Sequence, residues 1–289
     1  MTAREVNSKE PLSAFAHAGC SIRERYVPVD GQVSIRMVTF EPPRRRDALP
    51  MVLAVGLSTV MESFRGMLQA ITAERTVHYV ETREKPTSRV KGRVAFDMPA
   101  FARDVEAAVA AAGLQERGYL LAGYSLGATA IMHGYARIVP KPCCLLLAEP
   151  VPVFRFPWWG PSLVRLAVPL YGIVMPIVKW YLRRFRIDTS EDPEVMRIVE
   201  RALDTADPRK LQRAFLSIDG YAAWEHLGHI DARTLVIGTS KDTLHTHGDI
   251  VRLPEHIASC TLMDMEDNMA SHSGAMSDII RGFLGEMEN

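Results

Sequence analysis

Apolar runs alternate with segments of helical periodicity along most of this chain. Residues 23–38 alternate between polar and apolar on both sides of Asp30-Gly31, a pattern typical of a β-hairpin. A continuous apolar run at 50–56 predicts a strand buried on both faces, and apolar runs at 119–122 and 143–148 predict two more buried strands. Further strands are expected at 76–80, 234–238 and 260–263. Helices are expected between them, at 61–73, 98–114 and 276–286. This order predicts an α/β fold in which a mostly parallel sheet is covered by helices on both faces.

The stretch from 150 to 228 differs from the rest of the chain in composition and in hydrophobic pattern. It holds most of the tryptophans and a concentration of prolines, and it lacks the alternation of a strand. Within it we expect helices at 162–168, 171–185, 193–203 and 209–216. The predicted organisation is therefore a lead-in at 1–20, an α/β core formed by 21–149 and 229–289, and a helical cap at 150–228 inserted into that core.

The sequence around Ser125 carries the clearest chemical signal. Gly123-Tyr124-Ser125-Leu126-Gly127 follows a predicted strand and runs on into a helix of small residues. Strand, serine and helix in that order are the context of a nucleophile elbow. A Cβ on either flanking glycine would crowd the neighbouring strand or helix, and the helix N-terminus brings partial positive charge to the reacting centre. Ser125 is the predicted nucleophile.

A serine nucleophile needs a base, and the base needs a third group that orients it. Both partners are expected in loops at the carboxyl ends of parallel strands, in the order serine, acid, histidine. Asp242 follows the strand at 234–238 and is the predicted acid, with Asp249 and the strand-ending Glu149 as alternatives. His272 lies between the last strand and the last helix and is the predicted base. The other histidines weighed for this role, at the cap boundary or just after the acid, are His226, His229, His245 and His247.

Two backbone N–H groups are predicted to stabilise the oxyanion of a reacting carbonyl group. One belongs to Leu126, next to the nucleophile, and the other to Leu57, in the loop that follows the strand at 50–56. Donors held in such places act on the charge that develops in the transition state.

The Gly123–Gly127 elbow, the loop from Gly238 to Asp242, and His272 together resemble the α/β-hydrolase superfamily, in particular its serine esterase-like members with a helical cap. The resemblance of layout covers nearly the whole chain, from the hairpin to the final helix. Many members have His-Gly in the first oxyanion loop, whereas here Val55 stands in place of that His and Gly56 matches. The resemblance implies acyl transfer to water by a Ser-His-Asp triad through an acyl-enzyme.

Composition narrows the class of partner. Lys plus Arg and Asp plus Glu are both 34, so the chain has no net charge and no electrostatic footprint for nucleic acid. The four cysteines have no metal-ligand spacing, the pair His245 and His247 lacks a suitable third ligand, and no glycine-rich loop is of the kind that cradles phosphate, so we expect neither a metal nor another cofactor. Reduced thiols and a polar N-terminus without an apolar segment favour a cytoplasmic protein.

The cap sequence points to a hydrophobic small-molecule substrate. Its first part is rich in bulky apolar residues, among which Phe154, Trp158 and Trp159 are expected to line the substrate pocket. Residues 163–182 are mostly apolar, but charges, prolines and a glycine interrupt them, so a buried pair of cap helices is favoured over a membrane span. The alternative is that the cap contacts a membrane surface, which the nearby Arg183, Arg184 and Arg186 would suit.

These observations favour a serine hydrolase that cleaves a hydrophobic carboxylic ester. A thioesterase, an acyltransferase or a hydrolase of carbon–carbon bonds could use the same triad, because the selecting residues lie in the cap. A non-catalytic ligand-binding protein on this fold is the alternative from a different class.

Overall fold

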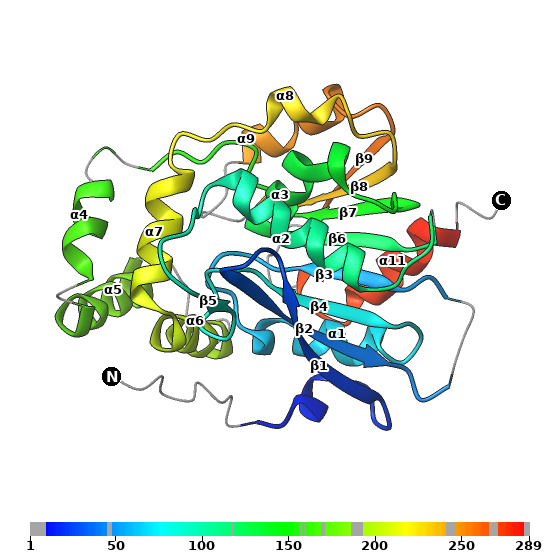
Figure 1. Ribbon diagram of the computed structural model, residues 1–289, viewed down its shortest axis with the longest axis horizontal. Coiled ribbons are helices and arrows are strands. Elements are labelled where there is room, and N and C mark those ends of the chain that lie inside the picture. Colours follow the sequence, from blue (N-terminus) through cyan, green and yellow to red (C-terminus); the bar gives the residue numbers. More distant parts are fainter. Residues whose placement is uncertain are drawn as a thin grey trace.

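The computed structural model describes residues 10–44, 48–116, 118–156, 158, 160–168, 171–185, 193–240, 247–265 and 271–285. These residues contain one nine-stranded sheet with the strand order β1-β2-β4-β3-β6-β7-β8-β9, and the short β5 pairs with β2 (Figure 1). The strands are β1 (Ser21–Pro28), β2 (Val33–Glu41), β3 (Met51–Ala54), β4 (Val77–Glu81), β5 (Arg89–Val90), β6 (Leu120–Tyr124), β7 (Cys144–Ala148), β8 (Arg233–Gly238) and β9 (Cys260–Asp264).

The sheet is antiparallel at one edge and parallel through its centre. β1 and β2 form the predicted hairpin, in which Asp30 Oδ1 accepts hydrogen bonds from the N–H groups of Gln32 and Val33, both at 2.8 Å. β2 also runs antiparallel to β4, whereas β4, β3, β6, β7, β8 and β9 are parallel to one another. The carboxyl ends of the parallel strands, where the site residues were expected, therefore meet along a single edge of the sheet.

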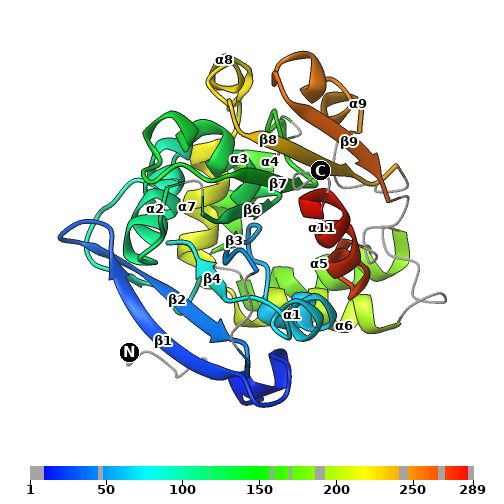
Figure 2. The same cartoon turned by 90° about the vertical axis from the view of Figure 1, so that its right-hand side faces the viewer.

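Helices cover both faces of the sheet, as predicted. One face packs against α2 (Met98–Ala111) and α3 (Leu126–Gly134), and the other against η1 (Leu12–Phe15), η2 (Met61–Phe64), α1 (Arg65–Ile71) and α11 (Ala275–Gly285) (Figure 2). β3, β4, β6 and β7 are buried along their whole length, which explains the continuous apolar sequences of β3, β6 and β7.

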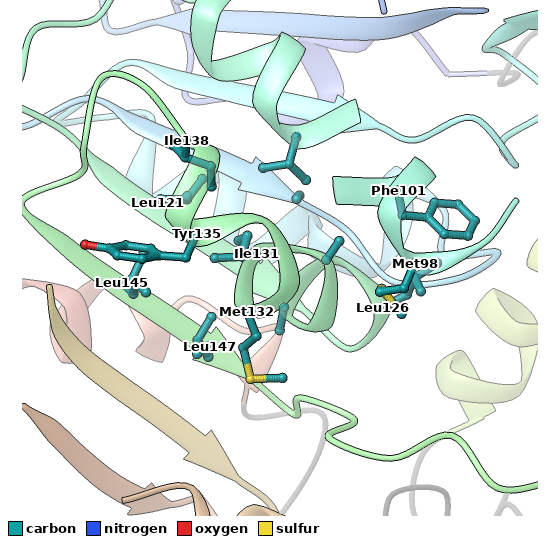
Figure 3. Close-up of a cluster of buried hydrophobic side chains, with 14 of the residues drawn as sticks. Met98, Phe101, Leu121, Leu126, Ile131, Met132, Tyr135, Ile138, Leu145 and Leu147 are labelled. Atoms are coloured by element: carbon teal, nitrogen blue, oxygen red, sulfur yellow. The ribbon is translucent and has the colours of Figure 1, made fainter. Parts of the chain in front are cut away.

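The core beside the elbow is close-packed around α3. Ile131 and Met132 of α3 lie over Leu121, Leu145 and Leu147 of the sheet, with α2 on the outer side (Figure 3). Large buried side chains on three elements thus hold the helix that starts behind Ser125 against its strands.

Of the five helices that the structure describes between β7 and β8, all in the predicted cap segment, four form a group. They are α4 (Gly160–Ala167), α5 (Tyr171–Phe185), α6 (Pro193–Thr205) and α7 (Pro208–Ile218), and they gather at one end of the molecule (Figure 1). The remaining elements are the short η3 (Tyr135–Arg137), α8 (Trp224–Leu227), α9 (His247–Ile250) and η4 (Leu253–Glu255). None of the helices that the structure describes is both long and apolar enough to cross a membrane.

Some boundaries differ from the sequence-based expectation for local reasons. The helix predicted at 98–114 ends at Ala111, because Gly113 adopts a left-handed φ of 69°. The helix predicted at 61–73 starts with a 3₁₀ turn, η2, before α1 begins. β5 is two residues long, too short to produce a periodic signal, and was not predicted.

Candidate active site

Ser125 sits on a strained turn between β6 and α3. Its backbone has φ 48° and ψ −115°, a conformation that non-glycine residues adopt rarely and mostly at functional sites. A Cβ on Gly123 would lie 2.6 Å from Ala128 Cα, and one on Gly127 would lie 2.3 Å from the carbonyl oxygen of Ala54. Both glycines are therefore required by backbone atoms of α3 and β3, which is the steric reason expected from the motif.

The loop after β3 lies directly against the nucleophile. A Cβ on Gly56 would be 3.3 Å from Ser125 Cβ, and Ser58 in the same loop has a left-handed φ of 55°. The buried Lys85 Nζ donates to the carbonyl oxygen of Gly56 at 2.5 Å and holds this loop from the end of β4. Among the described residues, neither the Leu57 N–H nor the Leu126 N–H donates to a backbone carbonyl group.

His272 is held close to the elbow by aromatic packing. Its ring lies 4.7 Å from the Phe64 ring and 5.0 Å from the ring of Tyr124, the residue before Ser125. The Tyr124 hydroxyl donates to the carbonyl oxygen of Ser271 at 2.6 Å, and Met67 N donates to the carbonyl oxygen of His272 at 3.3 Å. The histidine therefore has a defined place next to the end of β6.

Glu149 approaches His272 through a serine. Glu149 ends β7 with a left-handed φ of 48°, and only 3% of its surface is exposed. The Ser271 hydroxyl donates to Glu149 Oε1 at 2.6 Å and lies 2.9 Å from His272 Nδ1. Burial, with the nearby Glu149 carboxylate as the second cause, raises the pKa of Tyr124 well above its ordinary value.

One hydroxyl proton decides the direction of this chain of hydrogen bonds. Because Ser271 gives its proton to the Glu149 carboxylate, its oxygen must accept from His272 Nδ1. That contact assigns the imidazole hydrogen to Nδ1 and leaves Nε2 as the acceptor. An imidazole in this tautomer is prepared to take a proton from a nucleophile.

The other predicted site residues are placed as follows. Asp242, Trp159 and His245 lie outside the described residues. Asp249 is in α9, where Arg155 Nη1 lies 3.6 Å from its carboxylate. Trp158 is 90% exposed, whereas only 7% of the surface of Phe154 is exposed. Neither residue lines the cavity between the core and the cap segment.

A cavity of about 550 Å³ lies between the core and the helices of the cap segment. The loop after β3 contributes Ser58 and Met61, the end of β4 contributes Glu84 and Lys85, and α6 contributes Arg201. The volume is within the range of pockets that hold drug-sized ligands. Ser58 lies two residues after Gly56, so the loop after β3 borders both this cavity and Ser125, although Ser125 and His272 are not among the residues that line the cavity.

Two contacts join α6 to the core at this cavity. Arg201 Nε lies 2.5 Å from Glu62 Oε1, and the Ser58 hydroxyl donates to the carbonyl oxygen of Ala202 at 3.4 Å. Lys210 of α7 donates to the carbonyl oxygens of Lys85 and Ser88 at 2.8 and 2.6 Å. The helices thus rest on the loops that follow β3 and β4.

Sequence reasoning missed Ser271 and Lys85. Ser271 is adjacent to His272, so a neighbouring hydroxyl was the available signal. Lys85 belongs to the charged stretch Arg83-Glu84-Lys85, which follows a buried strand. Charged side chains next to a buried strand must be paired or hydrogen-bonded, because an unpaired buried charge is unfavourable. Arg83 in that stretch is fully buried and forms a two-point ion pair with Asp104, at 2.7 and 3.0 Å.

Comparisons with known proteins agree with this architecture. The family model described as "Alpha/beta hydrolase family" matches residues 41–275. A thermophilic esterase from Thermogutta terrifontis superposes with a TM-score of 0.75 at 16% identity, over 92% of this chain and 100% of that one. An enol-lactonase from Burkholderia xenovorans LB400 has a TM-score of 0.75 at 18% identity, over 90% and 100%. An N-formylmaleamic acid deformylase from Pseudomonas putida S16 has a TM-score of 0.65 at 16% identity, over 89% and 99%. A search of the curated protein sequences finds no significant match to this chain.

The family model spans most of the chain, from the end of β2 to the start of α11. The chain therefore belongs to the alpha/beta hydrolase family. It is an α/β-hydrolase enzyme, and the predicted fold class is confirmed.

Proposed function

We propose that this enzyme is a serine hydrolase that cleaves a carboxylic ester with a hydrophobic group, using Ser125 as nucleophile and His272 as general base. The observation that carries the proposal is the strained backbone of Ser125 beside a histidine whose Nδ1 is engaged by Ser271. Strain of this kind persists only where the surrounding structure enforces it, and it exposes the hydroxyl group at the top of the sheet.

In the first half-reaction Ser125 Oγ attacks the ester carbonyl carbon and its proton passes to His272 Nε2. The oxyanion accepts hydrogen bonds from the N–H groups of Leu57 and Leu126, and each such donor contributes about 10²- to 10³-fold to the rate. His272 then gives the proton to the leaving alkoxide, and an acyl-enzyme remains. In the second half-reaction His272 takes a proton from water and the hydroxide attacks the acyl carbon; the bond to Ser125 Oγ then breaks, His272 returns the proton to Ser125, and the acid product leaves.

Glu149 acts on His272 through Ser271. When His272 becomes an imidazolium ion, its Nδ1–H donates to Ser271 Oγ, and Ser271 in turn donates to the Glu149 carboxylate. The negative charge at the end of this relay stabilises the positive ring, and the fixed donor direction holds the productive tautomer. Asp242, which follows β8, is the alternative orienting acid: it would accept from Nδ1–H in place of Ser271, and it is tested alongside Glu149.

The cavity supports a substrate with both an apolar and a polar part. Apolar walls come from η1, η2 and the adjacent loop, in Leu12, Phe15, Val60 and Met61. Charged side chains line the rest, among them Arg36, Glu81, Glu84 and Arg201. A suitable substrate is therefore an ester with two parts. A hydrophobic acyl or aromatic group would pack against the apolar wall, and a polar group on the other side of the ester would face the charged side chains.

The first test uses a fluorophosphonate probe with detection by intact mass. Wild type should gain a single adduct, Ser125→Ala should gain none, and the exposed Ser217→Ala on α7 serves as a matched control that still reacts. Adduct formation should be followed by hydrolysis of a series of esters and thioesters of graded chain length. If Ser125→Ala keeps both the adduct and the turnover, the nucleophile lies elsewhere and the proposal fails.

A further inference from the structure

Helix α5 carries an exposed apolar stripe on one face. Ile177 is 60% exposed, Trp180 61% and Tyr181 48%, and Arg184, one turn further on, is exposed as well. These positions are i, i+3, i+4 and i+7, so at 100° per residue they form a single row along the helix. α5 lies at the end of the molecule opposite α11, away from the central sheet (Figure 1).

The opposite face of α5 packs on α6, which shows that the stripe points outward. Lys179 Nζ lies 2.5 Å from Asp204 Oδ1, Arg183 pairs with Glu200, and the Tyr171 hydroxyl donates to the carbonyl oxygen of Leu203 at 2.6 Å. Lys179 and Arg183 lie about 200° and 240° around the helix from Ile177. The polar contacts of α5 are therefore made with α6, and the large apolar side chains lie on the other side of the helix.

The segment of sequence that contains this stripe carries charge of one sign. Residues 150–187 contain six basic residues and no Asp or Glu, although the chain as a whole has no net charge. Lys179 and Arg183 face acidic residues of α6, and Arg155 faces Asp249. Arg155, Arg165, Arg183 and Arg184 are all exposed to solvent. The set of six is Arg155, Arg165, Lys179, Arg183, Arg184 and Arg186.

An aromatic and aliphatic stripe bordered by arginine is the composition of a helix that lies in a membrane interface. Trp and Tyr are favoured at the level of the lipid headgroups, and basic side chains are attracted to anionic lipids. A second copy of this chain fits less well, because a two-fold interface would set the same basic surface against itself. We propose that the outer face of α5 binds the surface of a membrane that contains anionic phospholipid.

The position of α6 connects this surface to the cavity. α6 packs against α5 on one side and contributes Arg201, Ala202 and Thr205 to the cavity wall. Both α5 and α6 lie between this surface and the cavity, so a hydrophobic substrate dissolved in the bilayer would meet the enzyme two helices away from the cavity. This consequence for catalysis rests on the proposed function, whereas the binding itself does not.

The experiment is co-sedimentation of the full chain with vesicles of phosphatidylcholine, with and without phosphatidylglycerol. Wild type should bind the mixed vesicles more tightly, and added salt should weaken that difference. The double variant Ile177→Ser, Trp180→Ser should lower the partition coefficient on both vesicle types by about tenfold or more, since it removes the buried apolar surface. Arg184→Gln should lower binding to the anionic vesicles alone, by about fivefold.

Matched controls come from exposed residues outside the cap segment. Val251→Ser removes an apolar side chain that is 40% exposed, and Arg103→Gln removes an exposed charge on α2; both should bind vesicles like wild type. Turnover of a water-soluble ester, measured on the same samples, should be unchanged in the α5 variants, which separates this proposal from the proposed function.

Three results would overturn the proposal. Wild type could fail to bind either vesicle, or the control variants could lose as much binding as the α5 variants. Size-exclusion chromatography could also show that wild type is a dimer which the α5 substitutions dissociate without any effect on vesicle binding. In that last case the stripe is an interface between two copies of the chain.

Discussion

The relay from Glu149 through Ser271 to His272 makes a quantitative prediction. Ser271→Ala removes the oxygen that accepts from Nδ1 at 2.9 Å and the proton that Glu149 Oε1 receives at 2.6 Å. Glu149→Gln keeps the shape of the side chain and removes its charge. Loss of the orienting acid in a serine triad lowers kcat by about 10⁴, so with an intervening hydroxyl we expect each variant to lose about 10² to 10⁴. That range corresponds to about 2.7 to 5.4 kcal/mol of transition-state stabilisation.

The double variant distinguishes a relay from two separate effects. Because both residues act along a single chain of hydrogen bonds, Glu149→Gln with Ser271→Ala should be about as slow as the slower single variant, rather than the product of the two losses. The assay is kcat and KM on a chromogenic ester, with thermal unfolding to show that every variant is folded. Ser273→Ala, the same change on the other side of His272, is the matched control and should stay within about tenfold of wild type.

Asp242→Asn belongs in the same series. If Ser271→Ala and Glu149→Gln both keep wild-type kcat/KM while Asp242→Asn loses several orders of magnitude, the relay is refuted and the sequence-based choice of acid is correct. If the two losses multiply in the double variant, Ser271 and Glu149 serve separate purposes and the inferred proton direction is wrong.

Three further predictions concern the elbow, the loop after β3 and a buried histidine of β4. Gly127→Ala should lower stability by about 3 kcal/mol and abolish turnover, because its Cβ would lie 2.3 Å from a backbone oxygen, whereas Gly282→Ala on α11, with nothing within 4 Å, should leave the melting temperature unchanged or slightly higher. Lys85→Met should reduce kcat by more than tenfold with the fold retained, since the Gly56 carbonyl loses its 2.5 Å donor, and the exposed Lys91→Met is the control; equal activities would show that Lys85 does not hold the oxyanion loop. Burial lowers the pKa of His78 to about 4, so between pH 4 and about pH 6.5 the ring stays neutral in the folded protein but takes up a proton in the unfolded chain. The stability contributed by His78 is therefore complete above about pH 6.5 and falls by up to about 1.4 kcal/mol per pH unit down to pH 4. In urea unfolding at several pH values, a His78→Gln variant whose free energy of unfolding changes with pH as steeply as that of wild type would contradict this.

The elbow shows how far local sequence reaches. Gly123 and Gly127 stand two residues on either side of Ser125, and the clashes that they avoid are with α3, the helix that begins at Leu126, and with β3. A strained turn between a strand and a helix needs those glycines wherever it occurs, so the motif predicts both the backbone and its chemistry. The hairpin at Asp30 is a second case, since Asp30 caps its own turn through Gln32 and Val33.

The wall of the cavity shows where sequence reasoning ends. Glu62 and Arg201 meet at 2.5 Å although 139 positions separate them (201 − 62), and neither is marked by any local pattern. The aromatic residues Phe154 and Trp158 are only four positions apart in one apolar stretch, yet Phe154 is buried in the core and Trp158 is 90% exposed. Composition predicts that a side chain prefers apolar surroundings, but the arrangement of helices decides which surroundings it receives.

The sequence by itself determined the order of strands and helices, the elbow with its nucleophile, and the loop that carries His272. Each of these depends on residues within a few positions of one another, whose backbone preferences and periodicity act locally. Only the tertiary structure decided that Glu149, 122 positions from Ser271, completes a hydrogen-bonded path to the imidazole, and that α6 closes a cavity over the loop after β3. Those contacts arise from strands meeting at one edge of a sheet, because convergence in space brings together residues that share no local pattern.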